Sequence, residues 1–120
     1  MVAKEGLGAY SQCAVARTAE RISPRKLNLV AQMVRGMDAQ HALKVLPFLK
    51  TRAAPIVHKA VRAAVANALH NGGISEPTVI IKAEVGSAGI MKRFRPGSHG
   101  RAKPILRRFA RIDIVLGKKK

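Results

Sequence analysis

A chain of 120 residues can form one modest hydrophobic core, which has to be built from Ala, Val, Ile and Leu because aromatic residues make up only 3% and Trp is absent. A net charge of +17, from 23 basic and 6 acidic residues, implies a polyanionic partner, of which nucleic acid is the obvious one. Cys13 is the single cysteine, so no intrachain disulfide is expected, and no apolar stretch approaches the roughly 20 residues of a membrane span.

The spacing of apolar residues predicts first a strand and then a helix. Residues 12–18 alternate as in a strand. Its two faces would carry Cys13, Val15 and Arg17, and Ala14, Ala16 and Thr18. Ser23 can then cap a helix that has Pro24 in its first turn, where the missing N–H matters least. The buried stripe of this helix is Leu27, Val30, Ala31 and Val34, and Gly36 predicts its end.

Two further helices follow. Asp38 can cap a short one that ends near Pro47, with an apolar stripe of Ala39, Ala42, Leu43 and Leu46. Thr51 can cap the longest one, which tolerates Pro55 in its first turn and ends at residues 71–73, Asn-Gly-Gly. Its buried face would be Val57, Ala60, Val61, Ala64, Val65 and Ala68.

After the third helix the period changes to that of strands. One half-buried strand is predicted where Val79, Ile81, Ala83 and Val85 alternate with Ile80, Lys82 and Glu84. Its partner carries Ala110, Ile112, Ile114 and Leu116. We therefore expect one α+β domain over residues 1–120, with three helices packed on a small three-stranded antiparallel sheet. A long protruding basic β-hairpin would span about 79–116 with a loop over 86–103, and 117–120 would form a basic tail.

Basic residues are concentrated in the last third of the chain, where no acid occurs between Glu84 and Asp113. The candidate nucleic-acid contacts there are Lys92, Arg93, Arg95, Arg101, Lys103, Arg107, Arg108 and Arg111. Arginine suits this role because its planar fork binds phosphate oxygens in pairs. The apolar Ile90, Met91 and Phe94 among these charges indicate insertion into a partner. A flexible solvated loop is the alternative interpretation.

A second, weaker basic set lies outside the hairpin. Its members are Arg17, Arg25, Lys26, Arg52, Lys59 and Arg62. These residues either contact phosphate or form ordinary solvated faces. Catalysis and metal binding have no support, because the four histidines are dispersed, the six carboxylates form no acid and base pair, and no phosphate-binding glycine loop occurs. We expect no enzyme, cofactor, metal or small-molecule substrate.

Several short segments occur in an order and spacing that resemble the large-subunit ribosomal protein L-twenty-two family, of bacterial or organellar type. They are Ile22-Ser23-Pro24-Arg25-Lys26, Leu29-Val30-Ala31, Arg35-Gly36, Ala66-Asn67-Ala68-Leu69-His70-Asn71, Met91-Lys92-Arg93 and Gly100-Arg101-Ala102. The resemblance covers about residues 12–116. It departs at 97–98, where the family commonly has Arg-Ala, and near 109–112, where it commonly has Thr-Ser-His-Ile.

The resemblance implies a structural role in ribosomes of the cytoplasm or of an organelle. The chain would bind large-subunit rRNA early in assembly, contact neighbouring large-subunit proteins, and line the nascent-peptide exit tunnel with its hairpin. Its partners would then include the nascent polypeptide, and no membrane. Carried over by position, the hairpin tip beside the macrolide site would be Ile90, Met91, Lys92 and Arg93.

Two other functions compete with this interpretation. The first helix, Gly36 and the second helix superficially resemble a helix-turn-helix, as in a sequence-specific DNA-binding regulator. However, residues 38–46 contain no Arg to read guanine. An RNA-processing enzyme would need a catalytic group, and the sequence offers none.

Overall fold

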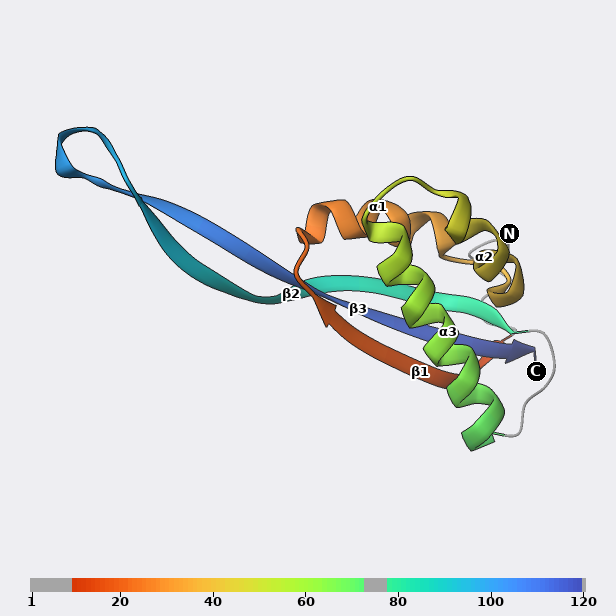
Figure 1. The fold of residues 1–120 in the computed structure, drawn as a ribbon. Helices are drawn as coiled ribbons and strands as arrows, with labels where there is room; N and C mark the ends of the chain where they lie inside the picture. Colours follow the sequence, from red (N-terminus) through yellow and green to blue (C-terminus); the bar gives the residue numbers. More distant parts are fainter. Residues whose placement is uncertain (1–9, 73–77, 120) are drawn as a thin grey trace.

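The computed structural model describes residues 10–72 and 78–119 (Figure 1). In chain order the elements are β1 (Tyr10–Glu20), α1 (Pro24–Val34), α2 (Ala39–Val45), the 3-10 turn η2 (Leu46–Phe48), α3 (Ala53–Gly72), β2 (Val79–Pro96), the 3-10 turn η3 (Ser98–Gly100) and β3 (Ala102–Lys119). The three strands form one antiparallel sheet in the order β1-β3-β2. The α+β fold of three helices and a three-stranded antiparallel sheet is confirmed.

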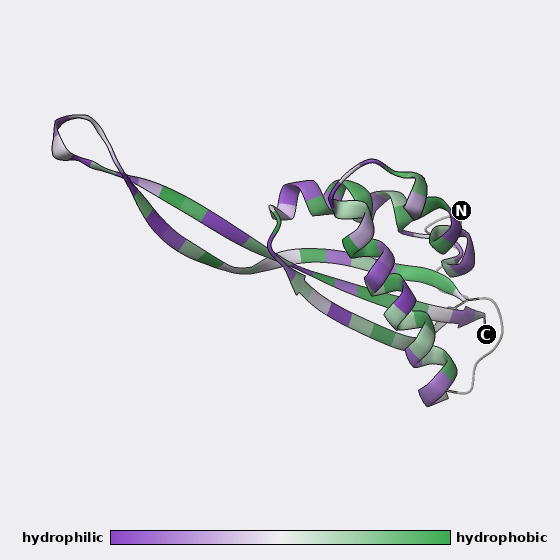
Figure 2. Cartoon of the chain, in the orientation of Figure 1, coloured by the Kyte–Doolittle hydropathy of each residue, from purple (hydrophilic) through white to green (hydrophobic). Residues whose placement is uncertain are grey.

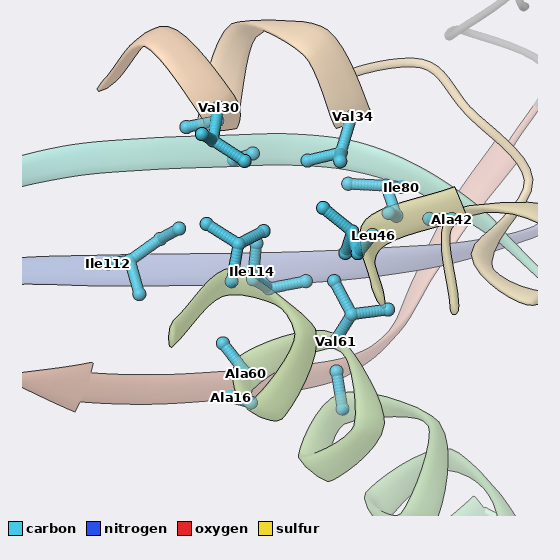
Figure 3. Packing of buried hydrophobic residues seen from close by; sticks show 14 of the residues in the cluster. Ala16, Val30, Val34, Ala42, Leu46, Ala60, Val61, Ile80, Ile112 and Ile114 are labelled. Atoms are coloured by element: carbon cyan, nitrogen blue, oxygen red, sulfur yellow. The ribbon is translucent and has the colours of Figure 1, made fainter. Parts of the chain in front are cut away.

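The helices pack on one face of the sheet, and the core lies between these two layers (Figures 1 and 3). The predicted stripe of α1 is buried throughout, and so are five of the six residues predicted for α3, with Val65 only half-buried. All four predicted inward residues of β3 are completely buried: Ala110, Ile112, Ile114 and Leu116. The buried apolar residues described are Ala, Val, Ile and Leu, as the composition predicts.

The helix boundaries follow local chemistry. Gly36, with a φ of 80°, follows α1, and its N–H donates to the carbonyl of Ile80 at 2.8 Å. The Asp38 carboxylate accepts from the N–H of Gln40 at 3.4 Å, so Asp38 caps α2 as predicted. Ser23 occupies the position before α1, but its side chain makes no capping hydrogen bond. The N–H of Ala54 donates to the carbonyl of Thr51 at 3.3 Å, where α3 begins.

Strand β2 differs from its prediction in which residues face the core. The alternation placed Ile81 on the same face as Ala83, whereas the structure buries Ile80 and Ala83 completely and leaves Ile81 half-buried. The reason is a β-bulge, because the pairing with β3 shifts between Ile80 and Lys82. One extra residue in a strand reverses the inward and outward positions on either side of it.

Two predicted irregular segments are strand. Of residues 86–103, expected to form a loop, all but the turn at 97–101 belong to β2 or β3, which pair as far as Pro96 and Ala102. The expected tail at 117–120 was also wrong for 117–119, since β3 continues to Lys119, which pairs with Tyr10. The side chain of Cys13, Gly73 and Lys120 lie outside the described residues.

Candidate nucleic-acid interface

Beyond the reach of β1, the strands β2 and β3 form a two-stranded ribbon. Strand β1 pairs with β3 only as far as Ala110, opposite Glu20, whereas β2 and β3 continue to pair from Gly89 and Phe109 outward. We call residues 89–109 the ribbon. It projects away from the helices (Figure 1) and accounts for the elongated dimensions of 64 × 26 × 25 Å.

The ribbon contains Lys and Arg residues but no Asp or Glu. Every one of its basic side chains is exposed: Lys92, Arg93, Arg95, Arg101, Lys103, Arg107 and Arg108. Arg95 lies directly opposite Lys103, and no acid occurs in the ribbon to separate the charges. Like charges in opposite positions destabilise a strand pair, so a neighbouring polyanion would stabilise this arrangement. Arg111 lies just below, with its guanidinium over Gly86.

Apolar residues are interspersed with these basic residues along the ribbon, as the colours of Figure 2 show. Paired residues lie on one face, and one face therefore carries Ile90, Lys92, Phe94, Pro104, Leu106 and Arg108. The other carries Met91, Arg93, Arg95, Lys103, Ile105 and Arg107. Phe94 is 77% exposed, although burial would be favourable for a side chain of this size. The ribbon can thus offer hydrophobic contact and charge on both sides.

The residues expected at the tip lie in the paired part of the ribbon. Ile90, Met91, Lys92 and Arg93 face Arg108, Arg107, Leu106 and Ile105 respectively. The turn itself spans Gly97 to Arg101, where the N–H of Gly97 donates to the carbonyl of Arg101. Residues 90–93 therefore occupy the shaft of the ribbon, several residues before its end.

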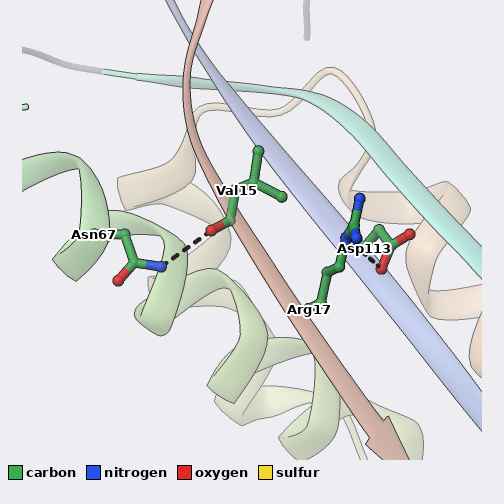
Figure 4. A network of polar contacts seen from close by, with 4 residues as sticks. All are labelled: Val15, Arg17, Asn67 and Asp113. Carbon is green, nitrogen blue, oxygen red and sulfur yellow. Dashed lines mark hydrogen bonds and ion pairs between the residues drawn. The ribbon is translucent and has the colours of Figure 1, made fainter. Parts of the chain in front are cut away.

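Arg17 has a partner within the protein. Its Nε lies 3.6 Å from Oδ1 of Asp113 on the neighbouring strand (Figure 4), and its side chain is 75% exposed. Asp113 also lies opposite Glu84 on its other side, so Arg17 offsets a repulsive pair of carboxylates. We therefore infer that Arg17 stabilises the sheet through Asp113 and is a weaker candidate for contact with nucleic acid than the basic residues of the ribbon.

Part of the second basic set gathers at the base of the ribbon. Lys26 and Arg52 line a pocket together with Arg107 and Arg108 of β3. Arg21 also lines this pocket and was not among the predicted contacts. The sequence could have indicated it, because it directly precedes the family-like Ile-Ser-Pro segment. Arg25, Lys59 and Arg62 are exposed on the helices and do not line this pocket.

Other site chemistries find no support in the parts of the chain that the structure describes. Residues 10–72 and 78–119 contain no group of three or more His, Cys, Asp or Glu side chains that could hold a metal ion. Within the same ranges, no helix has the length and apolar character needed to cross a membrane.

Comparison with known proteins identifies the family. Residues 15–117 match the family model described as ribosomal protein L22p/L17e. The chain belongs to this family. Its members are ribosomal proteins, a structural class and not a class of enzymes, and no comparison supports a DNA-binding regulator.

Curated relatives agree with the family match, and each bears the name large ribosomal subunit protein uL22. The protein of Lactobacillus delbrueckii subsp. bulgaricus is 41% identical over 104 residues, which cover 86% of this chain and 88% of the relative. That of Rickettsia typhi is 45% identical over 100 residues, covering 82% and 84%. That of Methylocella silvestris is 45% identical over 97 residues, covering 80% and 76%.

Two of the family-like segments have an internal structural role in this L22p/L17e chain. In Arg35-Gly36, Nη2 of Arg35 donates to the carbonyl of Ala83 at 2.6 Å, and Gly36 bonds to Ile80. In residues 66–71, Nδ2 of Asn67 donates to the carbonyl of Val15 at 3.0 Å (Figure 4). These side chains attach α1 to β2 and α3 to β1, and so position the sheet from which the ribbon extends.

Proposed function

We propose that this chain is a structural constituent of the large ribosomal subunit that binds large-subunit rRNA and supports subunit assembly. The observation that carries the proposal is the acid-free ribbon, whose seven basic side chains are all exposed. Phosphate contacts would offset their mutual repulsion. The relatives named as large-subunit proteins support the choice of rRNA as the polyanion.

The shape of the ribbon supports a finer proposal about its location. A two-stranded arm with cations and exposed apolar side chains on both faces is suited to a passage between RNA elements, where Phe94, Met91 and Leu106 would fill gaps. In this proposal the ribbon lines the nascent-peptide exit tunnel near the macrolide site. The nascent polypeptide and neighbouring large-subunit proteins are then further partners, in a cytoplasmic or an organellar ribosome. A map of subunits that carry a shortened ribbon tests this location.

The rRNA proposal is tested by removing two facing charges from the ribbon. The double variant Arg95→Gln/Lys103→Gln should bind large-subunit rRNA more weakly, and the slope of log K against log salt should become shallower by about 0.7 to 0.9 for each lost phosphate contact. Titrations of rRNA at several salt concentrations measure both quantities, and sucrose gradients show whether the chain migrates with the large subunit.

The matched control removes two exposed lysines that lie outside the ribbon and do not line the pocket at its base, Lys44→Gln/Lys82→Gln. It lowers the net charge equally but leaves the ribbon intact, so its salt slope should stay near that of the unmodified chain. Equal slopes for the two double variants would mean that net charge alone drives binding. Specific high affinity for duplex DNA, with no preference for rRNA, would instead favour a DNA-binding regulator.

A further inference from the structure

Three segments that are distant in the sequence meet at the base of the ribbon: residues 21–26, which lead from β1 into the first turn of α1, Arg52 directly before α3, and residues 106–108 of β3. They line the base pocket, an open hollow of about 490 Å³. Its lining is Arg21, Ile22, Ser23, Lys26, Arg52, Leu106, Arg107 and Arg108. Five of these eight residues are cations and none is an acid. Because these five cations repel one another, an anion bound among them would be stabilised.

An apolar groove of about 400 Å³ adjoins the base pocket between α1 and α3. The two hollows share Ile22, Ser23, Lys26 and Arg52. The groove adds Leu29, Val30, Thr51 and Ala53. Leu29 is 69% exposed although it lies beside the buried Val30, so its side chain is available for contact. Together the hollows form one continuous surface with a cationic part and an apolar part.

The helix directions add to the cationic character of this surface. Helix α1 begins at Pro24 and α3 begins at Ala53, so both N-terminal ends adjoin the shared residues. The N-terminus of a helix carries a partial positive charge that stabilises nearby anions. The side chain of Ser23 makes no capping hydrogen bond at α1. The backbone charge thus has the same sign as the five side chains.

We propose that this two-part surface binds one unstacked nucleotide of single-stranded RNA, with its phosphate in the base pocket and its base in the apolar groove. The proposal rests on the proposed rRNA function and adds a defined site to it. A nucleotide has the required chemistry, since it joins an anionic phosphate to a flat apolar base face. Arg52 lines both hollows, and its guanidinium can bind phosphate oxygens or lie against a base.

Two variants of the full-length chain separate the parts of the site. Leu29→Ser should weaken binding to large-subunit rRNA about fivefold to tenfold, through lost apolar contact, and leave the salt slope unchanged. Arg52→Gln should weaken binding and also make the slope shallower by about 0.7 to 0.9. Chemical probing of the bases should show one unpaired nucleotide that the unmodified chain protects and Leu29→Ser does not. Leu69→Ser, at a 52% exposed leucine outside both hollows, is the control and should change none of these readouts.

Each other outcome has a separate meaning. A shallower slope for Arg52→Gln with no effect of Leu29→Ser, and no protected base, would indicate a phosphate contact alone and overturn the nucleotide site. Unchanged rRNA binding by both variants would also overturn it, and so would loss of a neighbouring protein from reconstituted subunits with Leu29→Ser while rRNA binding persists. Failure of the unmodified chain to bind rRNA would instead refute the proposed function itself.

Discussion

Two hydrogen bonds from polar side chains to backbone carbonyls connect the helical layer to the sheet. Asn67 projects from α3 to the backbone of β1, and Arg35 projects from the end of α1 to the backbone of β2. Both bonds are partly buried and join residues about fifty positions apart. A buried carbonyl without a partner costs free energy, so these side chains stabilise the packing of helix on strand.

The Asn67 bond gives a prediction for stability. Asn67→Ala leaves the Val15 carbonyl without this donor and should lower the free energy of unfolding by about 1 to 2 kcal/mol. Urea unfolding at a fixed salt concentration measures the change. Asn71→Ala, at an exposed residue near the end of the same helix, is the control and should cost less. Because alanine is a better helix former than asparagine, propensity alone would stabilise both variants, so equal losses would show that the bond to Val15 does not set the effect.

The sequence predicts residues well where one side of an element is buried. The stripe of α1 and the inward residues of β3 were correct because burial imposes a period on apolar positions. Four of the five cations of the base pocket were candidates, Lys26, Arg52, Arg107 and Arg108, but Arg21 was not, and nothing in the sequence placed the four together. Their proximity depends on how α1, α3 and β3 pack, which no local pattern encodes.

At the scale of elements, a protruding basic hairpin was predicted, but its strands were predicted too short and its loop too long. Residues 86–103 lack alternation because neither face of the ribbon is buried, so a strand there has no apolar period to detect. Main-chain pairing continues nevertheless from the sheet below. The bulge at Ile81 was missed for a related reason: Ile80 and Ile81 are both apolar, and either could have faced the core.

A second bulge, between Ser87 and Gly89, lies where the sheet becomes the ribbon, and its backbone gives a prediction. Gly89 has a φ of +135°, which L side chains rarely adopt, although a methyl group added there would meet no atom within 4 Å. Gly89→Ala should therefore destabilise the ribbon base by roughly 1 to 3 kcal/mol through backbone strain alone. Hydrogen exchange of the amides from Ile90 to Phe94 measures local opening and should become faster.

Gly86→Ala is the matched control on the same strand. Gly86 is outside the positive-φ region, and the atoms nearest to a methyl group there would be those of the Arg111 guanidinium, with Nη2 at 3.0 Å. Because that side chain is flexible and exposed, it can move, and exchange should change little. Slower or unchanged exchange in Gly89→Ala would show that the bulge can relax to an ordinary φ.

In the molecule as a whole, the hydrophobic core and the basic ribbon occupy different parts of the chain. Its radius of gyration is 17.4 Å, against about 14 Å for a compact chain of this length. The buried core residues all lie outside 84–109, so the ribbon adds little to the core. It does add seven basic residues and no acid to a chain that already repels itself. Folding of the layered part should therefore not depend on the ribbon.

Replacing residues 90–108 by Asn-Gly tests this separation, because Gly89 and Phe109 already pair and a two-residue turn can join them. The net charge falls from +17 to +10, so the shortened chain should unfold at an equal or higher temperature at low salt, with a weaker dependence on salt. Thermal unfolding followed by circular dichroism measures both. The same shortened chain tests the proposed location of the ribbon. If the ribbon lines the exit tunnel, a map of large subunits that carry the shortened chain should show a gap in the tunnel wall. The response of these ribosomes to macrolides should also change. If the shortened chain fails to fold, the ribbon is needed for folding. If the tunnel is unchanged in the map, the ribbon does not line it.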